Sequence, residues 1–291
     1  MNEVKKAIIP LGGMATRFLP LSKAVPKELL PLADIPVIQY LVKEARDSGI
    51  KEIIFVLSAN NKNLLDYFKS SSKLEKVLKE RKKDECLSEL KEFDGLFEGM
   101  TFSYVIQKEP LGDGHAILQA AKLVKDEPVA VMFGDDVLDG PTPGIAQLMK
   151  MFKTCQKPII GTVKLPKEDI TAYGCLKVEK IANRFYKVKG IIEKPKMEEA
   201  PSNLAVCGKY IITPEVMQYL KKAKPTEKGE IIMAEVMNNQ MIKEGKLIYA
   251  YEFEGKWLEC GDKLKWMKSS IYFSLNHPKY GPELREYIKK I

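Results

Sequence analysis

The chain has 291 residues, of which 45% are hydrophobic and 30% are charged. This is the composition of an ordinary globular protein with one large core. The 47 Lys and Arg residues exceed the 39 Asp and Glu residues and give a net charge of +8. The basic residues are dispersed among acids and no aromatic-and-basic RNA motif is visible, so we expect no nucleic-acid partner.

No run of about 18 apolar residues is present, which predicts that nothing in the chain spans a membrane. The segment from Met1 to Lys6 leads directly into the first expected strand and leaves no space for a secretory signal. The five cysteines lie far apart without a C-x-x-C pair, and only two histidines are present, which argues against a zinc site. We therefore expect a cytoplasmic protein.

Short β-branched runs alternate with helical patterns, which predicts an α/β fold with a doubly wound, mostly parallel sheet flanked by helices. Strands are expected at residues 7–10, 52–57, 102–106, 129–133, 159–163, 187–192, 206–212 and 247–252. Helices are expected at residues 36–49, 114–124, 214–222 and 231–243, with another helix after Lys263. The pattern predicts a main domain over residues 1–263 with a helical insertion at about 61–96. Residues 264–291 then form a helical tail that we expect to be a subunit interface of a homo-oligomer.

The segment after the first strand has the residue types of a phosphate-binding loop. Gly12 and Gly13 follow the strand and lack a Cβ, so main-chain N–H groups there can approach a ligand closely. Three cations follow at Arg17, Lys23 and Lys27, and prolines at 20, 26 and 31 keep this loop from becoming helical. For the two glycines alone, an ordinary strand-turn-helix corner is the favoured interpretation, because their spacing matches neither common nucleotide-binding fingerprint.

Carboxylates occur after two strands. Asp135 and Asp136 follow the strand at 129–133, and Asp262 follows a late strand. Two carboxylates, phosphate oxygens and water suit magnesium better than zinc. Asp135 and Asp136 in isolation are as typical of a turn or helix cap.

Three further positions are candidates for ligand contacts. Gln107 follows a strand and precedes a turn, where an amide can read a base edge or simply face solvent. Glu193 and Lys194 end a strand, and because neighbouring strand residues point to opposite faces, they converge only if the strand bends there. His115 is interpreted as a helix-start or packing residue in preference to a general base.

These motifs together resemble those of bacterial UTP–glucose-1-phosphate uridylyltransferases, in the sugar-nucleotide pyrophosphorylase group. The similarity extends from about Lys6 to Lys263, and the motifs follow one another in the same order as in that family. It rests on the opening loop and on residues 107–112, 134–136, 193–195 and 261–263, with further matches at 201–205 and 251–256.

The resemblance implies a nucleotide-diphospho-sugar transferase fold, with residues 1–263 as the catalytic domain. It also implies Mg2+-assisted transfer of uridylyl from UTP to glucose-1-phosphate, which gives UDP-glucose and pyrophosphate. The site residues that it implies fall into four groups. The catalytic ones are Arg17, Lys27 and Lys194; the nucleotide-binding ones are Leu11, Gly12, Gly13, Gln107, Gly112 and Asp135; the sugar-binding ones are Gly174, Glu193, Gly208 and Glu230; and the metal ligands are Asp135 and Asp262.

The chain departs from the family pattern at a few positions. Ala15 replaces a usual glycine, so this residue either has negative φ or accepts about 1 kcal/mol of strain. Asp113 replaces a usual apolar residue, and Ile232 and Glu235 replace Gln and Asp. A thymidylyltransferase or another hexose-1-phosphate nucleotidyltransferase is the close alternative. A non-catalytic sugar-nucleotide sensor is a second one, and a dehydrogenase is disfavoured because no acid ends the second strand.

Overall fold

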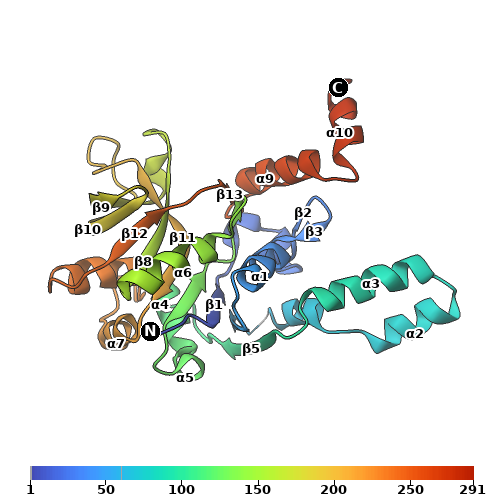
Figure 1. Ribbon diagram of the computed structural model, residues 1–291, viewed down its shortest axis with the longest axis horizontal. Helices are drawn as coiled ribbons and strands as arrows, with labels where there is room; N and C mark the ends of the chain where they lie inside the picture. Colours follow the sequence, from blue (N-terminus) through green and yellow to red (C-terminus); the bar gives the residue numbers. More distant parts are fainter. Residues whose placement is uncertain (1, 60) are drawn as a thin grey trace.

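The computed structural model describes residues 2–59 and 61–291. Its centre is a nine-stranded sheet, with two small two-stranded sheets beside it (Figure 1). In spatial order the large sheet consists of β5 (Thr101–Ile106), β4 (Glu52–Leu57), β1 (Lys6–Leu11), β6 (Val129–Met132), β11 (Leu204–Ile212), β8 (Ile159–Lys164), β12 (Tyr249–Glu252), β10 (Phe185–Glu193) and β9 (Gly174–Ala182). The small sheets pair β2 (Pro31–Leu32) with β3 (Ile35–Pro36), and β7 (Asp136–Asp139) with β13 (Lys256–Glu259).

The α/β class is confirmed, but the expectation of a mostly parallel sheet needs correction. The run β5-β4-β1-β6 is parallel, as is the pair β8–β12. Strand β11 is antiparallel to both neighbours, and β9, β10 and β12 pair antiparallel. Strands β9 and β10 are joined by only two residues, Asn183 and Arg184, and so short a connection permits only antiparallel pairing. The sheet is therefore mixed.

Helices cover both faces of the sheet. Alternate residues of β1 enter different cores: Ala7 and Ile9 face one, and Ile8 faces the other. The first core contains residues of α1 (Val37–Asp47) and α6 (Gly144–Cys155). The second contains residues of α4 (Asp113–Gln119), α5 (Ala121–Val124), α7 (Pro214–Lys222) and α8 (Met233–Val236).

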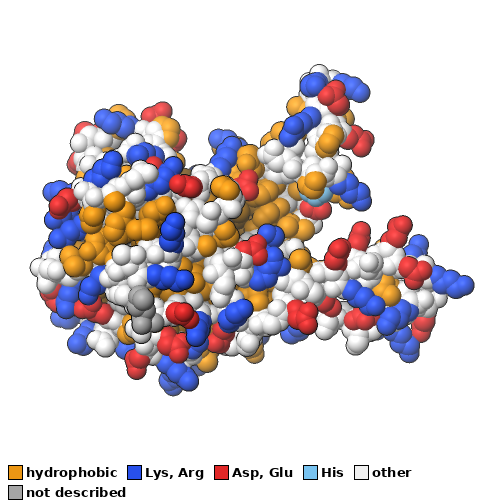
Figure 2. All heavy atoms as spheres, viewed as in Figure 1, with side chains coloured by type: hydrophobic (Ala, Val, Ile, Leu, Met, Phe, Trp, Pro, Cys, Tyr) orange, Lys and Arg blue, Asp and Glu red, His pale blue; other side chains and the backbone are white. Residues whose placement is uncertain are grey.

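Two helical pairs extend from this body (Figures 1 and 2). One is α2 (Ser72–Glu80) with α3 (Asp84–Leu96), and the other is α9 (Lys263–Asn276) with α10 (Gly281–Ile288). The start of α9 packs on the body, where Trp266 Nε1 donates to the Pro31 carbonyl at 3.2 Å and Ser269 Oγ donates to the Glu259 carbonyl at 2.9 Å. Within the described residues, no helix combines the length and apolar character needed to cross a bilayer.

Several element boundaries differ from the sequence expectations. The helix expected at 114–124 is divided at Ala120 into α4 and α5, and the one expected at 231–243 consists of α8 followed by a π-helix, Met237–Ile242. Strands β7, β9 and β13 and helix α6 were not expected. The remaining described helical turns are short 3₁₀ segments: Thr16–Phe18, Leu21–Lys23, Lys27–Leu29, Lys62–Phe68 and Ile170–Ala172.

Candidate active site

Two adjoining cavities lie at the carboxyl ends of β1, β5 and β6, where ligands bind in open α/β folds. The larger one, of about 1160 Å³, and a smaller one, of about 330 Å³, share Asp113, Phe133, Asp135 and Glu230 in their linings. Of the residues named from the sequence, the larger cavity is lined by Arg17, Asp135, Gly174, Glu193, Lys194, Gly208, Glu230 and Asp262. The smaller one is lined by Leu11, Gly12, Gly13, Lys27, Gln107, Gly112, Asp135 and Glu230. The fold therefore brings all these residues, far apart in the chain, to one continuous region.

The glycine turn and Gln107 form one wall of the smaller cavity. Gln107 is 4% exposed and follows β5, and its backbone N–H donates to the Leu57 carbonyl at 2.8 Å. A Cβ on Gly12 would lie 2.3 Å from Gln107 Oε1, so only glycine permits this approach. Gln107 Nε2 donates to the Gly112 carbonyl at 3.1 Å, which leaves Oε1 as the amide atom nearest the glycine turn.

The cation Lys27 and the carboxylate Asp135 are paired in the structure. Lys27 Nζ lies 2.6 Å from Asp135 Oδ2. Burial alone would raise the pKa of Asp135, but the ammonium of Lys27 and the charge of Arg17 outweigh it and hold that pKa below its ordinary value. Burial conversely lowers the pKa of Lys27, and Asp135 more than compensates, so the net shift is upward. Both groups are charged at neutral pH.

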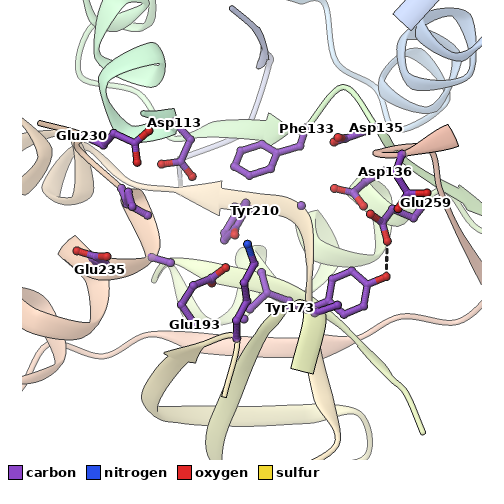
Figure 3. A pocket seen from close by; sticks show the side chains of 18 of the residues that line it. Asp113, Phe133, Asp135, Asp136, Tyr173, Glu193, Tyr210, Glu230, Glu235 and Glu259 are labelled. Carbon is purple, nitrogen blue, oxygen red and sulfur yellow. Dashed lines mark hydrogen bonds between the residues drawn. The ribbon is translucent and has the colours of Figure 1, made fainter. Parts of the chain in front are cut away.

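Asp136 is 7% exposed and lines the larger cavity beside Asp135 (Figure 3). Its Oδ1 accepts a hydrogen bond from Trp257 Nε1 at 2.6 Å, and burial followed by the charge of Asp135 raises its pKa to about 7. A Cβ on Gly208 would lie 2.2 Å from Asp136 Oδ2. The absence of a side chain at Gly208 is therefore already required by the packing of Asp136, whether or not a sugar approaches it.

At the end of β10, a bend in the backbone places two adjacent residues at the same cavity. Lys194 has φ +46°, a left-handed conformation, and its N–H donates to the Tyr173 carbonyl at 3.0 Å. This bend interrupts strand alternation, so that both Glu193 and Lys194 line the larger cavity. A Cβ on Gly174 would lie 3.0 Å from Glu193 Oε2, which explains a small residue there.

Asp113 joins the turn at 111–114 to the segment that carries Glu230. Its Oδ1 accepts hydrogen bonds from the backbone N–H groups of Gly114 at 2.6 Å and Met233 at 2.9 Å. The Ile231 N–H donates to the Leu111 carbonyl, and the Gly114 N–H also donates to the Ile231 carbonyl. Burial raises the pKa of Asp113 to about 6, and the two backbone donors act in the opposite direction. Figure 3 shows Asp113 and Glu230 next to each other at the cavity wall.

Asp262 and Asp135 come from adjacent loops. The Cys260 N–H donates to the Asp135 carbonyl at 2.7 Å, and an ideal Cβ on Gly261 would lie 3.1 Å from Asp135 Oδ2. Asp262 Oδ1 accepts from the Lys265 N–H at 3.0 Å and so begins α9. Within the described residues, no group of three or more His, Cys, Asp or Glu side chains forms a metal cluster. Asp135 and Asp262 both line the larger cavity, and carboxylate oxygens, together with substrate oxygens and water, are the kind of ligand that magnesium prefers.

Three further residues, Tyr173, Glu259 and Lys265, form a cluster at this end of the cavity that was not predicted from the sequence. Lys265 Nζ lies 2.7 Å from Glu259 Oε2 and 4.5 Å from the centre of the Tyr173 ring. Tyr173 donates its hydroxyl hydrogen to Glu259, as Figure 3 shows. All three residues line the larger cavity. Tyr173 directly precedes Gly174, and Glu259 and Lys265 each lie two residues from the 261–263 motif, which was the available sequence signal.

Known proteins are similar to this chain over its whole length. The family model described as nucleotidyl transferase matches residues 6–270. UTP–glucose-1-phosphate uridylyltransferase of Staphylococcus haemolyticus is 40% identical over 100% of this chain and 99% of its own length, and its Bacillus subtilis namesake is 38% identical over 99% and 97%. A UTP-bound UGPase structure from Acinetobacter baumannii has a TM-score of 0.91 at 32% identity and covers 99% of both chains. A UDP-glucose pyrophosphorylase complexed with UDP-glucose has a TM-score of 0.82 at 35% identity, over 93% of this chain and 98% of that one. With its two-cavity site and this full-length similarity, the chain belongs to the nucleotidyl transferase family, among relatives that are UTP–glucose-1-phosphate uridylyltransferases.

Proposed function

We propose that the protein transfers uridylyl from UTP to glucose-1-phosphate and releases UDP-glucose and pyrophosphate. The observation that carries this function is the meeting of two cavities at Asp135 and Glu230 in a chain similar over its full length to uridylyltransferases. The smaller cavity has the glycine turn and an amide suited to a nucleotide. The larger one is rich in carboxylates, which accept hydrogen bonds from sugar hydroxyls.

The proposed reaction is an in-line attack by a phosphate oxygen of glucose-1-phosphate on the α-phosphorus of UTP. A phosphate monoester has a second pKa of about 6, so the nucleophile is already largely a dianion and needs no protein base. Arg17 and Lys27 neutralise the triphosphate, and Lys194 brings the sugar phosphate close to it. No covalent enzyme intermediate is needed.

Substrate contacts divide between the two cavities in this proposal. Leu11, Gly12, Gly13, Gln107, Gly112 and Asp135 contact the nucleotide, and Gly174, Glu193, Gly208 and Glu230 contact the hexose. The hydrogen bonds between the 111–114 turn and the 231–233 segment support this division, because they fix the nucleotide wall relative to Glu230.

We also propose that Asp135 and Asp262 hold a magnesium ion, which when bound supplies positive charge to the phosphates. The ammonium group of Lys27 pairs with the carboxylate of Asp135 and keeps it ionised, which is the form that binds a cation. Removing divalent ions with EDTA should abolish turnover, and adding Mg2+ should restore it. Retention of full activity in EDTA would contradict the metal site.

The proposed setting is a cytoplasmic homo-oligomer with no nucleic-acid or membrane partner. All five cysteines are free thiols, as is usual for proteins of a reducing compartment such as the cytoplasm. In the proposed domain organisation, residues 1–263 catalyse with the insertion at about 61–96, and residues 264–291 contact a second subunit. The side chains of Leu264, Met267 and Ile271 are 49–60% exposed on α9, which supports such a contact.

The deciding experiment is a pyrophosphate-release assay over four nucleoside triphosphates and several sugar-1-phosphates, with and without Mg2+. The UTP and glucose-1-phosphate pair should give the highest kcat/KM. A higher value with dTTP would favour the thymidylyltransferase, and binding of UDP-glucose without release from any pair would favour the sensor.

A further inference from the structure

His115 lies between two amide side chains and has no role in the reaction described above. Its Nδ1 is 3.0 Å from Gln107 Nε2, and its Nε2 is 3.0 Å from Gln119 Nε2. Gln107 lines the smaller cavity, and His115 and Gln119 line a separate small pocket behind it. The imidazole is therefore a second layer behind the nucleotide wall.

The hydrogen-bond partners determine which way the Gln107 amide points. The Gly112 carbonyl can only accept, so the amide nitrogen of Gln107 must face it. The second hydrogen on that nitrogen points to His115 Nδ1, which must offer a lone pair. A neutral imidazole then carries its proton on Nε2. The structure places Gln119 Nε2 at this ring nitrogen, so the Gln119 amide has to be turned by 180° for its oxygen to accept that proton, which gives up the 3.3 Å bond to the His115 carbonyl.

Because the amide nitrogen of Gln107 donates to both the Gly112 carbonyl and His115 Nδ1, the amide oxygen Oε1 is left to face the bound nucleotide. Oε1 is the atom that a Cβ on Gly12 would meet at 2.3 Å, so it lies against the glycine turn. An acceptor at this position is matched by a base that carries a ring N–H, as uracil does at N3. Cytosine has a lone pair at its N3, which would face the lone pairs of Oε1 in a site where Gln107 is 4% exposed.

We propose that His115 is a positioning residue that sets pyrimidine selectivity: by accepting from Gln107 Nε2, it keeps Oε1 toward the base and so favours uracil over cytosine. This inference rests on the nucleotide-binding role proposed for Gln107. Without His115, the amide nitrogen loses one of its two acceptors, and rotation of the amide toward a cytosine becomes less unfavourable.

The test compares kcat/KM for UTP and CTP in the wild type, His115→Leu and His115→Asn. Asn retains an acceptor near the position of Nδ1, whereas Leu removes it. We expect His115→Leu to lower the UTP-to-CTP ratio about tenfold, roughly the effect of one hydrogen bond. The change should lie in the KM for UTP, with the KM for glucose-1-phosphate unchanged, and His115→Asn should recover most of the ratio. Gln119→Leu, a control on the outer side of the ring, should change the ratio less than about threefold.

A double-mutant cycle separates positioning from general packing. In a Gln107→Leu background, His115→Leu should have no further effect on the ratio, because the amide through which it acts is gone. Equal losses for UTP and CTP, an additive effect in the cycle, or an Asn variant as impaired as Leu would overturn the proposal. If circular dichroism shows that His115→Leu is unfolded, His115→Phe takes its place in each comparison. An inactive wild type would instead refute the proposed function, and calorimetric binding of UMP and CMP would still measure the ratio.

Discussion

Lys27 Nζ and Asp135 Oδ2 lie 2.6 Å apart at the junction of the two cavities, although 108 positions separate the residues in sequence. One comes from the loop after β1 and the other from the loop after β6, and these two strands are parallel neighbours in the sheet. The pair thus connects the glycine-rich loop to the carboxylate loop. Each partner keeps the other charged, which suits a site for polyanions.

Replacing Lys27 with Ala should reduce kcat/KM by about 10²–10³, as removal of other preorganised charge donors does. The loss has two causes, since the triphosphate loses a cation and Asp135 loses its counter-charge. Pyrophosphate release measures it. Lys23→Ala, on the exposed part of the same loop, is the matched control and should cost less than about tenfold. Similar losses for the two variants would contradict a special role for Lys27.

Replacing Lys194 with Ala should reduce kcat/KM by about a hundredfold or more, because this side chain is proposed to hold the two anionic substrates together. Lys196→Ala is the control, because Lys196 lies two residues further on and is exposed. Steady-state kinetics with glucose-1-phosphate as the varied substrate provide the measurement. Nearly full turnover in Lys194→Ala would show that the assignment is wrong.

Asp113→Asn should change how stability depends on pH. Burial raises the folded-state pKa of Asp113 to about 6, above the ordinary value of 3.8, so the folded protein binds this proton more tightly than the unfolded chain. Ionisation therefore destabilises the fold as pH rises from about 4 to above 6. Asn keeps an oxygen for Gly114 and Met233 but carries no charge.

The free energy of unfolding of Asp113→Asn, relative to wild type, should rise by about 1–3 kcal/mol between pH 4 and pH 7.5. Urea denaturation at several pH values gives this difference, in which the titration of the other groups cancels. A difference that stays constant with pH would show that Asp113 titrates normally.

Ala15→Gly should stabilise the loop slightly. Ala15 has φ +48° and ψ +37°. The sequence allowed either a negative φ or a strained conformation at this residue, and the structure shows the strained conformation. Glycine removes a strain of about 1 kcal/mol but adds chain entropy to the unfolded state, which leaves a net gain below about 1 kcal/mol. Ala15→Val, whose branched side chain tolerates positive φ poorly, should destabilise. Thermal unfolding of both variants would check the opposite signs.

Met267→Glu with Ile271→Glu should shift the protein toward monomers. These side chains are 49% and 55% exposed and lie one turn apart on α9, and charges there would oppose burial in a subunit interface. Light scattering after gel filtration gives the mass. A wild-type monomer, or a variant with unchanged mass, would contradict an interface on this face. Lys268→Glu, a charge change between the two positions, is the control.

The sequence by itself determined most strands, the α/β class and the residue types that gather at the site. The spacing of apolar residues and the positions of turn residues are local properties of the sequence. For this reason, β4 and α7 were both predicted with their observed ends. Motifs such as that of Gln107 and Gly112 could be recognised because their residues and their order along the chain resemble those of a known family.

Only the tertiary structure decided strand direction, the bend at Lys194 and the partners of Asp113 and His115. Strand direction depends on connections and neighbours that a local pattern does not encode, which is why the sheet proved to be mixed. The orientation of the Gln107 amide depends on hydrogen-bond partners on a different element, α4. Such contacts exist only once the chain has folded, because burial forces each polar atom to find whichever partner the packing brings near.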